Sequence, residues 1–283
     1  MKLIWSYLKS KHRWLLLDCF GGFLFVVVNL GMPTILARMI DEGITQNNPE
    51  RLTFWAIMMF VIVVLGIAGR ISLVYASGKL TTSMIKELRT DIYAKLQTYS
   101  HHEYEQIGVS SLVTRMTSDA FVLMQFAEMS LRIGVVTPLM MIFSVIMILI
   151  TSPSLAWIVA VSMPFLVIVV IYVAMKTRPI STKQQQTLDK INQYVRENLM
   201  GLRVIRAFAR EDFQEERFAQ QNQEYATISS RLFTLTGLTE PLFVQIIIAM
   251  IVAIVWFALD PLAKGSLQIG DLVAFIEYSF HAL

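Results

Sequence analysis

Long apolar stretches alternate with long polar stretches along the chain, and the apolar ones are long enough to cross a membrane as helices. Crossing roughly 30 Å of hydrocarbon takes about 20 helical residues. Five stretches reach this length, near residues 16–40, 54–76, 129–150, 155–175 and 238–259, and a sixth opens near residue 269. The pattern predicts an all-α membrane protein of six spans, with the sixth span, 269–283, incomplete in this chain.

Two long polar connections, after the second and the fourth apolar stretch, also predict helix. Each runs for about 50 to 60 residues with few glycines and prolines, and it is rich in residues of good helix propensity. In the second connection, Leu188, Ile191, Val195 and Leu199 keep helical spacing. We expect each connection to be a pair of helices that continue the spans, projecting roughly 40 Å from the membrane.

Basic residues are distributed unevenly between the two ends of the spans. They precede the first span and fill both long connections, whereas the short loops DEGITQNNPE, TSPS and DPLAKGS contain only Lys264. Loops rich in Lys and Arg stay in the cytoplasm. The distribution predicts a multi-pass protein with a cytoplasmic N-terminus. In the short loops, we expect Ser152 to N-cap the helix that follows it and Pro261 to lie just past the end of the fifth span.

The composition fits a chain that occupies two environments. Hydrophobic residues make up 55% of the chain and charged residues 16%, which is too apolar for an ordinary soluble domain and too polar for membrane throughout. A phosphate-binding loop of the form GxxxxGK[ST] is missing, because YASGKLTT lacks the first glycine and follows no strand. We therefore expect no catalytic site here, and the chain as given cannot hydrolyse ATP. We also expect no metal site, because the neighbouring His101 and His102 point to different sides of a helix.

Four motifs resemble one protein family. The stretch ENLMGLRVIRAFAREDFQEERF (197–218) resembles the signature between the fourth and fifth helices of ATP-binding-cassette (ABC) exporter transmembrane domains of the six-helix, domain-swapped, multidrug-exporter type. SSLVTRMTSDA (110–120), IDEGI (40–44) and GSLQIGDLVAFIEY (265–278) are similar to other stretches of that family, in the same order. The sequence departs from the pattern at Ser110 and Thr114, where the family often has Gly and Ser.

The resemblance implies long cytosolic helical extensions with a coupling helix at the tip of each, docked on a nucleotide-binding domain. By position, the first would lie near Val109–Met116 and would carry Ser111 and Arg115. The second would lie near Arg206–Glu211. Phe208 would be an apolar knob in the partner domain, with Arg206 and Arg210 beside it. Two alternatives remain open, in which Phe208 packs only inside the hairpin and the arginines are a solvated helix face.

A few polar residues lie deep in the predicted spans. Glu277 falls near mid-membrane in the sixth span, and Asn29 and Gln245 lie in the first and fifth. Since charges at this depth usually face a cavity or a partner, Glu277 is the first candidate for the substrate pathway and the two amides are weaker ones. An interhelical hydrogen bond from protonated Glu277 is the alternative. The ionisable residues near the inner boundary are expected to snorkel or pair there, and they are Asp18, Arg70, Glu128, Arg132 and Glu240.

The resemblance implies the membrane subunit of an ATP-driven exporter, a half-transporter that pairs with an identical or different second half. ATP and Mg²⁺ would bind in a nucleotide-binding domain, which is absent from the chain as given. The expected partners are the lipid bilayer, nucleotide-binding domains, the second half and an amphipathic or drug-like small molecule, and no nucleic acid is expected.

Two other classes of function stay open. An ion-coupled secondary transporter would use Glu277 as its proton or ion site, and its transport would depend on pH rather than on ATP. A non-transporting membrane scaffold would bind a soluble partner through its arms without ligand-stimulated turnover.

Overall fold

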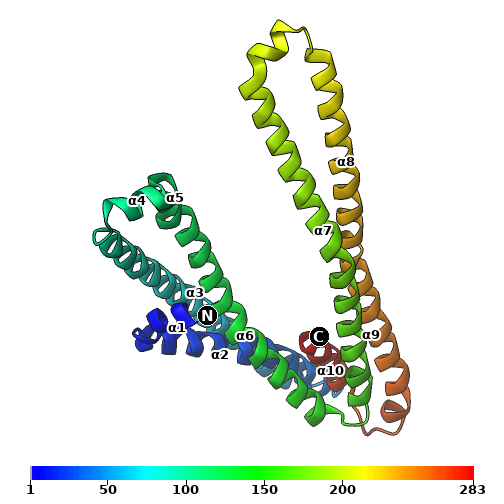
Figure 1. Cartoon of the computed structure of the whole chain (residues 1–283). Helices are drawn as coiled ribbons and strands as arrows, with labels where there is room; N and C mark the ends of the chain where they lie inside the picture. Colours follow the sequence, from blue (N-terminus) through cyan, green and yellow to red (C-terminus); the bar gives the residue numbers. More distant parts are fainter. Residues whose placement is uncertain (1) are drawn as a thin grey trace. The chain divides into compact units, whose positions relative to one another are not determined.

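The computed structural model describes residues 2–283, and all regular secondary structure in this part of the chain is helical (Figure 1). This confirms the all-α prediction. The chain divides into two compact units. Unit 1 runs to Ala156 and includes Phe257–Leu283, and unit 2 is Trp157–Trp256.

Unit 1 begins with a short N-terminal helix and contains most of the separate elements. They are α1 (Lys2–Lys9), α2 (His12–Arg38), the π-helix η1 (Met39–Ile44), α3 (Pro49–Leu96), α4 (His101–Ile107), α5 (Val109–Thr114), the π-helix η2 (Arg115–Asp119), α6 (Ala120–Thr151) and α10 (Ile269–Ala282). Unit 2 is a hairpin built from α7 (Ala156–Ala207), α8 (Glu211–Gly237) and most of α9 (Thr239–Ala263).

Within residues 2–283, five continuous helical stretches are long and apolar enough to cross a membrane. They are His12–Ile44, Pro49–Leu96, Val109–Thr151, Ala156–Ala207 and Glu211–Ala263. The first five predicted spans lie inside them, except that the fourth was expected to begin one residue earlier, at Leu155. α3 and α7 continue past their apolar parts without a break, so the polar connections are helical extensions of the spans. The chain is therefore a multi-pass membrane protein.

Close backbone contact joins α2 to α3 in unit 1. A Cβ atom on Gly21 would lie 2.7 Å from the backbone nitrogen of Leu73 and 3.0 Å from the carbonyl oxygen of Gly69, so only glycine fits without a shift. Small residues let membrane helices approach in this way, and the gain is van der Waals packing. The two helices consequently pack along much of their length.

α10 is held against the C-terminal end of α2 and against η1. Asp41 of η1 is buried, and its Oδ1 accepts a hydrogen bond of 2.8 Å from the backbone N–H of Gly270. The Thr34 and Tyr278 hydroxyls are hydrogen-bonded at 2.6 Å. The first turn of every helix has free backbone N–H groups, and Asp41 satisfies one of those of α10. The N-cap residue of α10, Gln268, makes no side-chain cap.

Polar and aromatic contacts hold the arm of unit 2 together. Gln184 Nε2 donates to Ser229 Oγ at 2.8 Å, and the Tyr194 hydroxyl donates to the carbonyl oxygen of Gln214 at 3.0 Å. The Tyr194 ring stacks on Phe218 with a centroid distance of 6.4 Å, and the Arg217 guanidinium lies 5.3 Å from the Tyr194 centroid. Tyr194 is thus the central side chain of this arm.

Both predictions for the short loops were wrong. Ser152 is the C-cap of α6 and has extended backbone angles, and a turn separates it from α7, which begins at Ala156. Pro261 lies inside α9 rather than beyond its end. A proline two residues before a helix end removes only one helical hydrogen bond, and here its carbonyl oxygen accepts from the N–H groups of Ser266 and Leu267 at 3.0 and 3.3 Å.

Candidate functional site

The first arm tip is a short, well-capped helix, α4, between α3 and α5 (Figure 1). The Ser100 N–H donates to Glu103 Oε2 at 2.7 Å, and the Glu103 N–H donates to Ser100 Oγ at 3.4 Å, which completes a capping box. The Tyr104 hydroxyl donates to the carbonyl oxygen of Leu96 at 2.8 Å. Gly108, with φ of 80°, then redirects the chain into α5.

The first coupling helix was expected near Val109–Met116, and its coupling role stays a prediction. In the structure, Val109–Met116 is helical and begins the returning helix, formed by α5 and η2 and continued by α6, and the short helix His101–Ile107 precedes it. The left-handed backbone at Gly108 separates the two, and that conformation is available mainly to glycine. The stretch SSLVTRMTSDA (110–120) therefore lies on the returning helix, after the short helix of the tip.

Ser111 and Arg115 lie on this returning helix. Ser111 is half-buried and Arg115 is exposed. Arg115 also lines a cavity of about 330 Å³ together with Tyr7, Asp91, Lys95 and Tyr99. Arg115 thus lies at the base of the tip, where a helix from the N-terminus also contributes.

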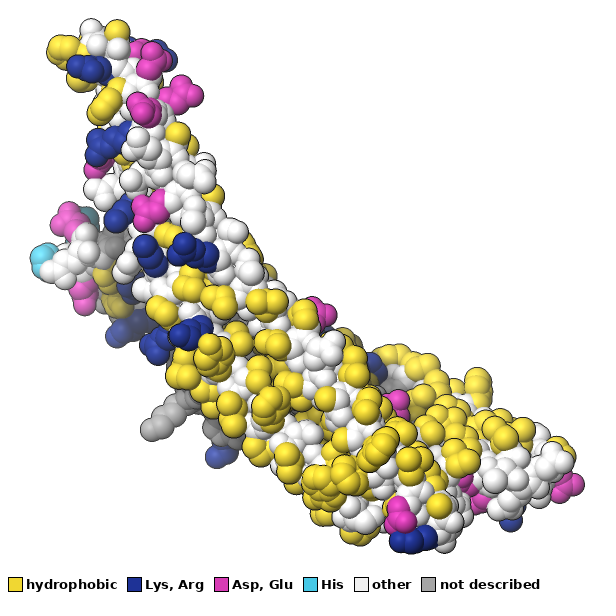
Figure 2. All heavy atoms as spheres, turned by 90° about the vertical axis from the view of Figure 1, so that its right-hand side faces the viewer, with side chains coloured by type: hydrophobic (Ala, Val, Ile, Leu, Met, Phe, Trp, Pro, Cys, Tyr) yellow, Lys and Arg dark blue, Asp and Glu magenta, His cyan; other side chains and the backbone are white. Residues whose placement is uncertain are grey.

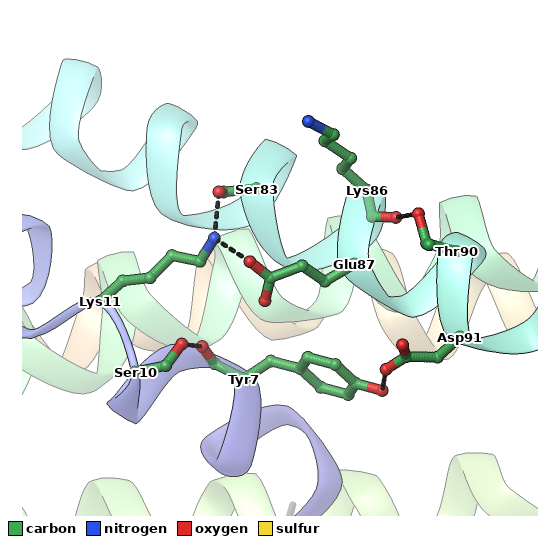
Figure 3. A network of polar contacts seen from close by, with 8 residues as sticks. All are labelled: Tyr7, Ser10, Lys11, Ser83, Lys86, Glu87, Thr90 and Asp91. Atoms are coloured by element: carbon green, nitrogen blue, oxygen red, sulfur yellow. Dashed lines mark hydrogen bonds and ion pairs between the residues drawn. The ribbon is translucent and has the colours of Figure 1, made fainter.

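The N-terminal segment is attached to α3 by polar contacts (Figure 3). The Tyr7 hydroxyl donates to Asp91 Oδ2 at 2.6 Å, and the Lys11 ammonium contacts Glu87 Oε1 at 2.5 Å and also Ser83. The hydrogen bond to Asp91 raises the pKa of Tyr7, with burial as a smaller cause. The contact between Tyr7 and Asp91 is therefore complete below the ordinary tyrosine pKa and is lost as the pH rises through the raised pKa of the folded state.

The second arm tip is a turn and not a helix, so the prediction of a coupling helix at Arg206–Glu211 was wrong. α7 ends at Ala207 and α8 begins at Glu211. Ala209 has a φ of 48°, and the N–H of Arg210 bonds back to the carbonyl oxygen of Ile205 at 3.1 Å. A left-handed residue just past the last turn is a common helix ending, and here it leaves too few residues for another helix.

Phe208 is at this turn and is 74% exposed. The side chains of Arg206 and Arg210 on either side of it are exposed as well. The structure therefore contradicts the alternative in which Phe208 packs only inside the hairpin. Other exposed apolar side chains near the turn are Leu199, Met200, Val204 and Phe213.

The two tips differ in charge as well as in shape. Glu103 and Glu105 lie on α4, whereas the second tip combines Arg203, Arg206 and Arg210 with Glu211 and Asp212 in the first turn of α8. The Ser100 backbone and hydroxyl hydrogen bonds lower the pKa of Glu103, so its carboxylate persists further into acid. A partner domain would meet acidic groups at one tip and both basic and acidic groups around an aromatic side chain at the other.

Two of the three predicted pathway residues, Asn29 and Glu277, lie in unit 1 and the third, Gln245, lies in unit 2. Glu277 is exposed on α10, and Asn29 is half-buried on α2, where its amide donates to the carbonyl oxygen of Phe25 at 2.7 Å. Gln245 lies in unit 2 and lines a largely apolar cavity of about 490 Å³ between α7 and α9, with Trp157 and Ser162. Only Gln245 is therefore placed on a cavity, and Asn29 is engaged by its own helix.

Two buried aspartates were not predicted as site residues. Asp18 was expected to snorkel or pair at the inner boundary, but it is fully buried and accepts a hydrogen bond from Ser77. Its second oxygen has no hydrogen-bond partner among the described residues. Asp41 holds α10 from a distant part of the sequence. No local pattern in the sequence indicates either contact. By contrast, the i, i+4 spacing of Glu128 and Arg132 predicted an ion pair, and this pair is present at 2.6 Å.

Known proteins resemble this chain over nearly its whole length. It matches the model of the ABC transporter transmembrane region over residues 15–282. An ABC transporter ATP-binding protein of Mycobacterium tuberculosis (strain CDC 1551 / Oshkosh) is 27% identical over 252 residues, which cover 89% of this chain and 43% of that protein. The ABC transporter ATP-binding protein YfiB of Bacillus subtilis is 27% identical over 254 residues, 90% of this chain and 44% of that protein.

A third relative has a more specific description. The ATP-dependent lipid A-core flippase of Acinetobacter baylyi is 25% identical over 272 residues, which cover 96% of this chain and 47% of the flippase. The chain spans less than half the length of each of these three relatives. With its membrane-length helices and long arms, the chain belongs to the ABC transporter transmembrane region family.

Proposed function

We propose that the chain is the membrane subunit of an ATP-driven exporter and that its two arms transmit movement from nucleotide-binding domains to the membrane. The observation that carries this proposal is Phe208, an aromatic side chain that is 74% exposed in the turn of an arm. Buried aromatic and arginine side chains dominate the binding energy of protein interfaces. Phe208 between Arg206 and Arg210 has the composition of such an anchor.

The arms have the mechanical form that this role requires. α3 has 48 residues and α7 has 52, so at about 1.5 Å per residue each is roughly 75 Å long. A tip displaced by a partner domain would carry its arm with it, because the arm is one continuous helix from the tip to the membrane part. ATP and Mg²⁺ would bind in the nucleotide-binding domains, and their closure would switch the membrane part between inward-facing and outward-facing states.

The proposal includes the orientation of the chain in the membrane and its partners. The arms and the N-terminus face the cytoplasm of a bacterium, and the spans cross its inner membrane, in line with the distribution of Lys and Arg. A second half, either another copy or a related chain, would cover apolar side chains that unit 2 leaves exposed on α7 and α9, among them Phe165, Ile168 and Val252.

The proposed substrate is an amphipathic small molecule. Gln245 and Ser162 are polar groups on a largely apolar cavity, a combination that suits a molecule with one polar and one apolar part. The flippase relative is named for an amphipathic lipid. Glu277, on the exposed face of α10, would contact a polar or cationic group of the substrate.

The test is ATPase activity of the complete transporter reconstituted in vesicles, measured with and without candidate drugs. Phe208→Ala should lose drug stimulation while basal hydrolysis persists, because the site of hydrolysis is elsewhere. Phe233→Ala is a matched control, since Phe233 is 69% exposed on α8 but lies far along the helix from the turn. Equal stimulation in wild type and Phe208→Ala, or transport that follows pH and ignores ATP, would refute the proposal.

Glu277→Gln tests the substrate pathway separately. The substitution keeps size and hydrogen bonding and removes the charge, so the concentration of a cationic drug that gives half-maximal stimulation should rise, while that of a neutral drug stays the same. Unchanged values for both drugs would remove Glu277 from the pathway without affecting the role of the arm tips.

A further inference from the structure

A groove lined by cationic and polar side chains lies on α7 just beyond its apolar part. Its lining residues are Arg178, Pro179, Thr182, Lys183 and Gln186, and its volume is about 480 Å³. Arg178, Thr182 and Gln186 follow each other at intervals of four residues, so they share one face of the helix. Pro179 lies between them, inside the helix, and has no backbone N–H for the preceding turn.

The groove lies at the level of the membrane boundary. The apolar stretch of α7 ends near residue 175, and the Lys176 ammonium lies 5.8 Å from the centroid of the Tyr172 ring. Tyrosine and lysine side chains of this kind are typical of the interface between hydrocarbon and water. Arg178 follows by two residues, or about 3 Å of helix, which places it among the lipid headgroups.

The charge in the groove is positive and only weakly compensated. None of the lining residues is acidic. Within residues 2–283, Arg178 makes no ion pair, and Lys183 has one distant partner, Glu224, at 3.9 Å with both side chains largely exposed. A contact of 2.8 Å between Gln184 and Ser229 also brings Arg231 of the antiparallel α8 to nearly the same level.

The surface of the hairpin shows the same boundary. In Figure 2, dark blue Lys and Arg side chains gather where the yellow apolar surface gives way to the more polar arm. Clusters of cations immediately beside a membrane span bind anionic headgroups, and basic pockets at this depth are specific sites for them. A guanidinium group is especially suited to phosphate, because its N–H groups match two phosphate oxygens.

We propose that this groove binds the phosphate of an anionic phospholipid in the leaflet on the arm side of the membrane. Arg178 and Lys183 neutralise the phosphate, the Gln186 amide donates a hydrogen bond to it, and the acyl chains lie along the apolar part of α7. The lipid thereby fixes the depth of α7 at the point where the arm begins. This site does not depend on ATP-driven transport, and its test requires no substrate.

The test compares lipid binding to the complete transporter in detergent, by native mass spectrometry, with equal amounts of phosphatidylglycerol and phosphatidylcholine. Wild type should retain phosphatidylglycerol preferentially. Because each cation near the surface contributes about fivefold to the affinity for anionic lipid, R178Q/K183Q should lower the preference by roughly twenty-fivefold. Both side chains are exposed, so we expect the variant to keep the thermal stability of wild type.

Lys190→Gln is the control, because it removes one positive charge from the same helix about 10 Å beyond Lys183 along the arm. It should retain at least half of the wild-type preference. An equal loss in Lys190→Gln, or full preference in R178Q/K183Q, would overturn the site, since binding would then follow total charge. Should the double variant unfold, a wild-type preference for phosphatidylglycerol that withstands 1 mM inorganic phosphate would still support the proposal. Displacement of the lipid by that phosphate would show a free-anion site instead and would overturn it.

Discussion

The two units of the chain are held together by different means. In unit 1, α2 and α3 approach so closely that Gly21 has no room for a Cβ atom, and buried polar groups join helices across the packing, as Asp18 and Ser77 do. In unit 2, the arm is held by separate side-chain contacts around Tyr194. Gly201 of its α7 has open space where a Cβ atom would be.

This difference indicates which parts of the molecule can move. A packed helix pair has few alternative arrangements, because shifting either helix creates clashes or voids. A hairpin joined at a few points can change its spacing while each helix remains intact. Unit 1 therefore has the character of a rigid body, and the arm of unit 2 can respond to whatever binds its tip.

Matched glycine substitutions test this contrast and should have the largest effect. Gly21→Ala places a methyl group 2.7 Å from the Leu73 nitrogen, so α2 and α3 must separate at a cost of about 2 to 3 kcal/mol. Gly201→Ala meets no atom within 4 Å and should stabilise α7 by about 0.5 to 1 kcal/mol. Unfolding of the purified protein in detergent, followed by intrinsic fluorescence, would measure both. Equal effects at the two positions would contradict the contrast.

Two buried serines of unit 1 provide a second pair. Ser77 donates a hydrogen bond to the buried Asp18, whereas the hydroxyl of the equally buried Ser144 has no partner among the described residues. Ser77→Ala should lower the free energy of unfolding by about 2 kcal/mol, because the carboxyl group loses its donor. Ser144→Ala should change it by less than about 0.5 kcal/mol. The same unfolding assay measures both variants. A larger loss of stability in Ser144→Ala than in Ser77→Ala would show that the hydrogen bond between Ser77 and Asp18 is unimportant.

The central contact of unit 2 should have a smaller and more local effect. Tyr194→Phe keeps the ring that stacks on Phe218 and removes the hydroxyl that donates to Gln214. The expected loss is about 1 kcal/mol, confined to the arm. Hydrogen exchange followed by mass spectrometry should show faster exchange in α7 and α8 near this contact and no change in α2 or α3. Faster exchange throughout unit 1 would mean that the arm and the packed body unfold together.

The features that the sequence predicted well are periodic and local. The spans and the long arms follow from runs of apolar residues and from helical spacing, as at Leu188, Ile191 and Val195, and the pair Glu128 and Arg132 follows from its spacing within one helix. The sequence did not locate the helix ends at the tips, because these ends depend on single backbone conformations, at Gly108 and Ala209. Asn29 and Gln245 were chosen by depth alone, and depth does not reveal the direction of a side chain around its helix. The burial of Asp18 and Asp41 depends on residues far away in the sequence, so no local pattern could indicate it.

The tips themselves allow the finest test of the comparison, through the response of α4 to acid. The pKa of Glu103 is lowered by the Ser100 backbone and hydroxyl hydrogen bonds, so the capping interaction is complete above the ordinary glutamate pKa and is lost as the pH falls through the lower value of the folded state. Hydrogen exchange of α4, corrected for the intrinsic pH dependence, should accelerate severalfold in that range. Glu103→Gln should remove the acceleration, because a glutamine at this position also completes a capping box and does not titrate.

The start of α8 has no side-chain cap, so the exchange of its first turn should not respond to Glu103→Gln at any pH. If α4 exchanged equally in both proteins under acid, the order of the first tip would have to come from packing against Tyr104 and Leu96 and not from its cap.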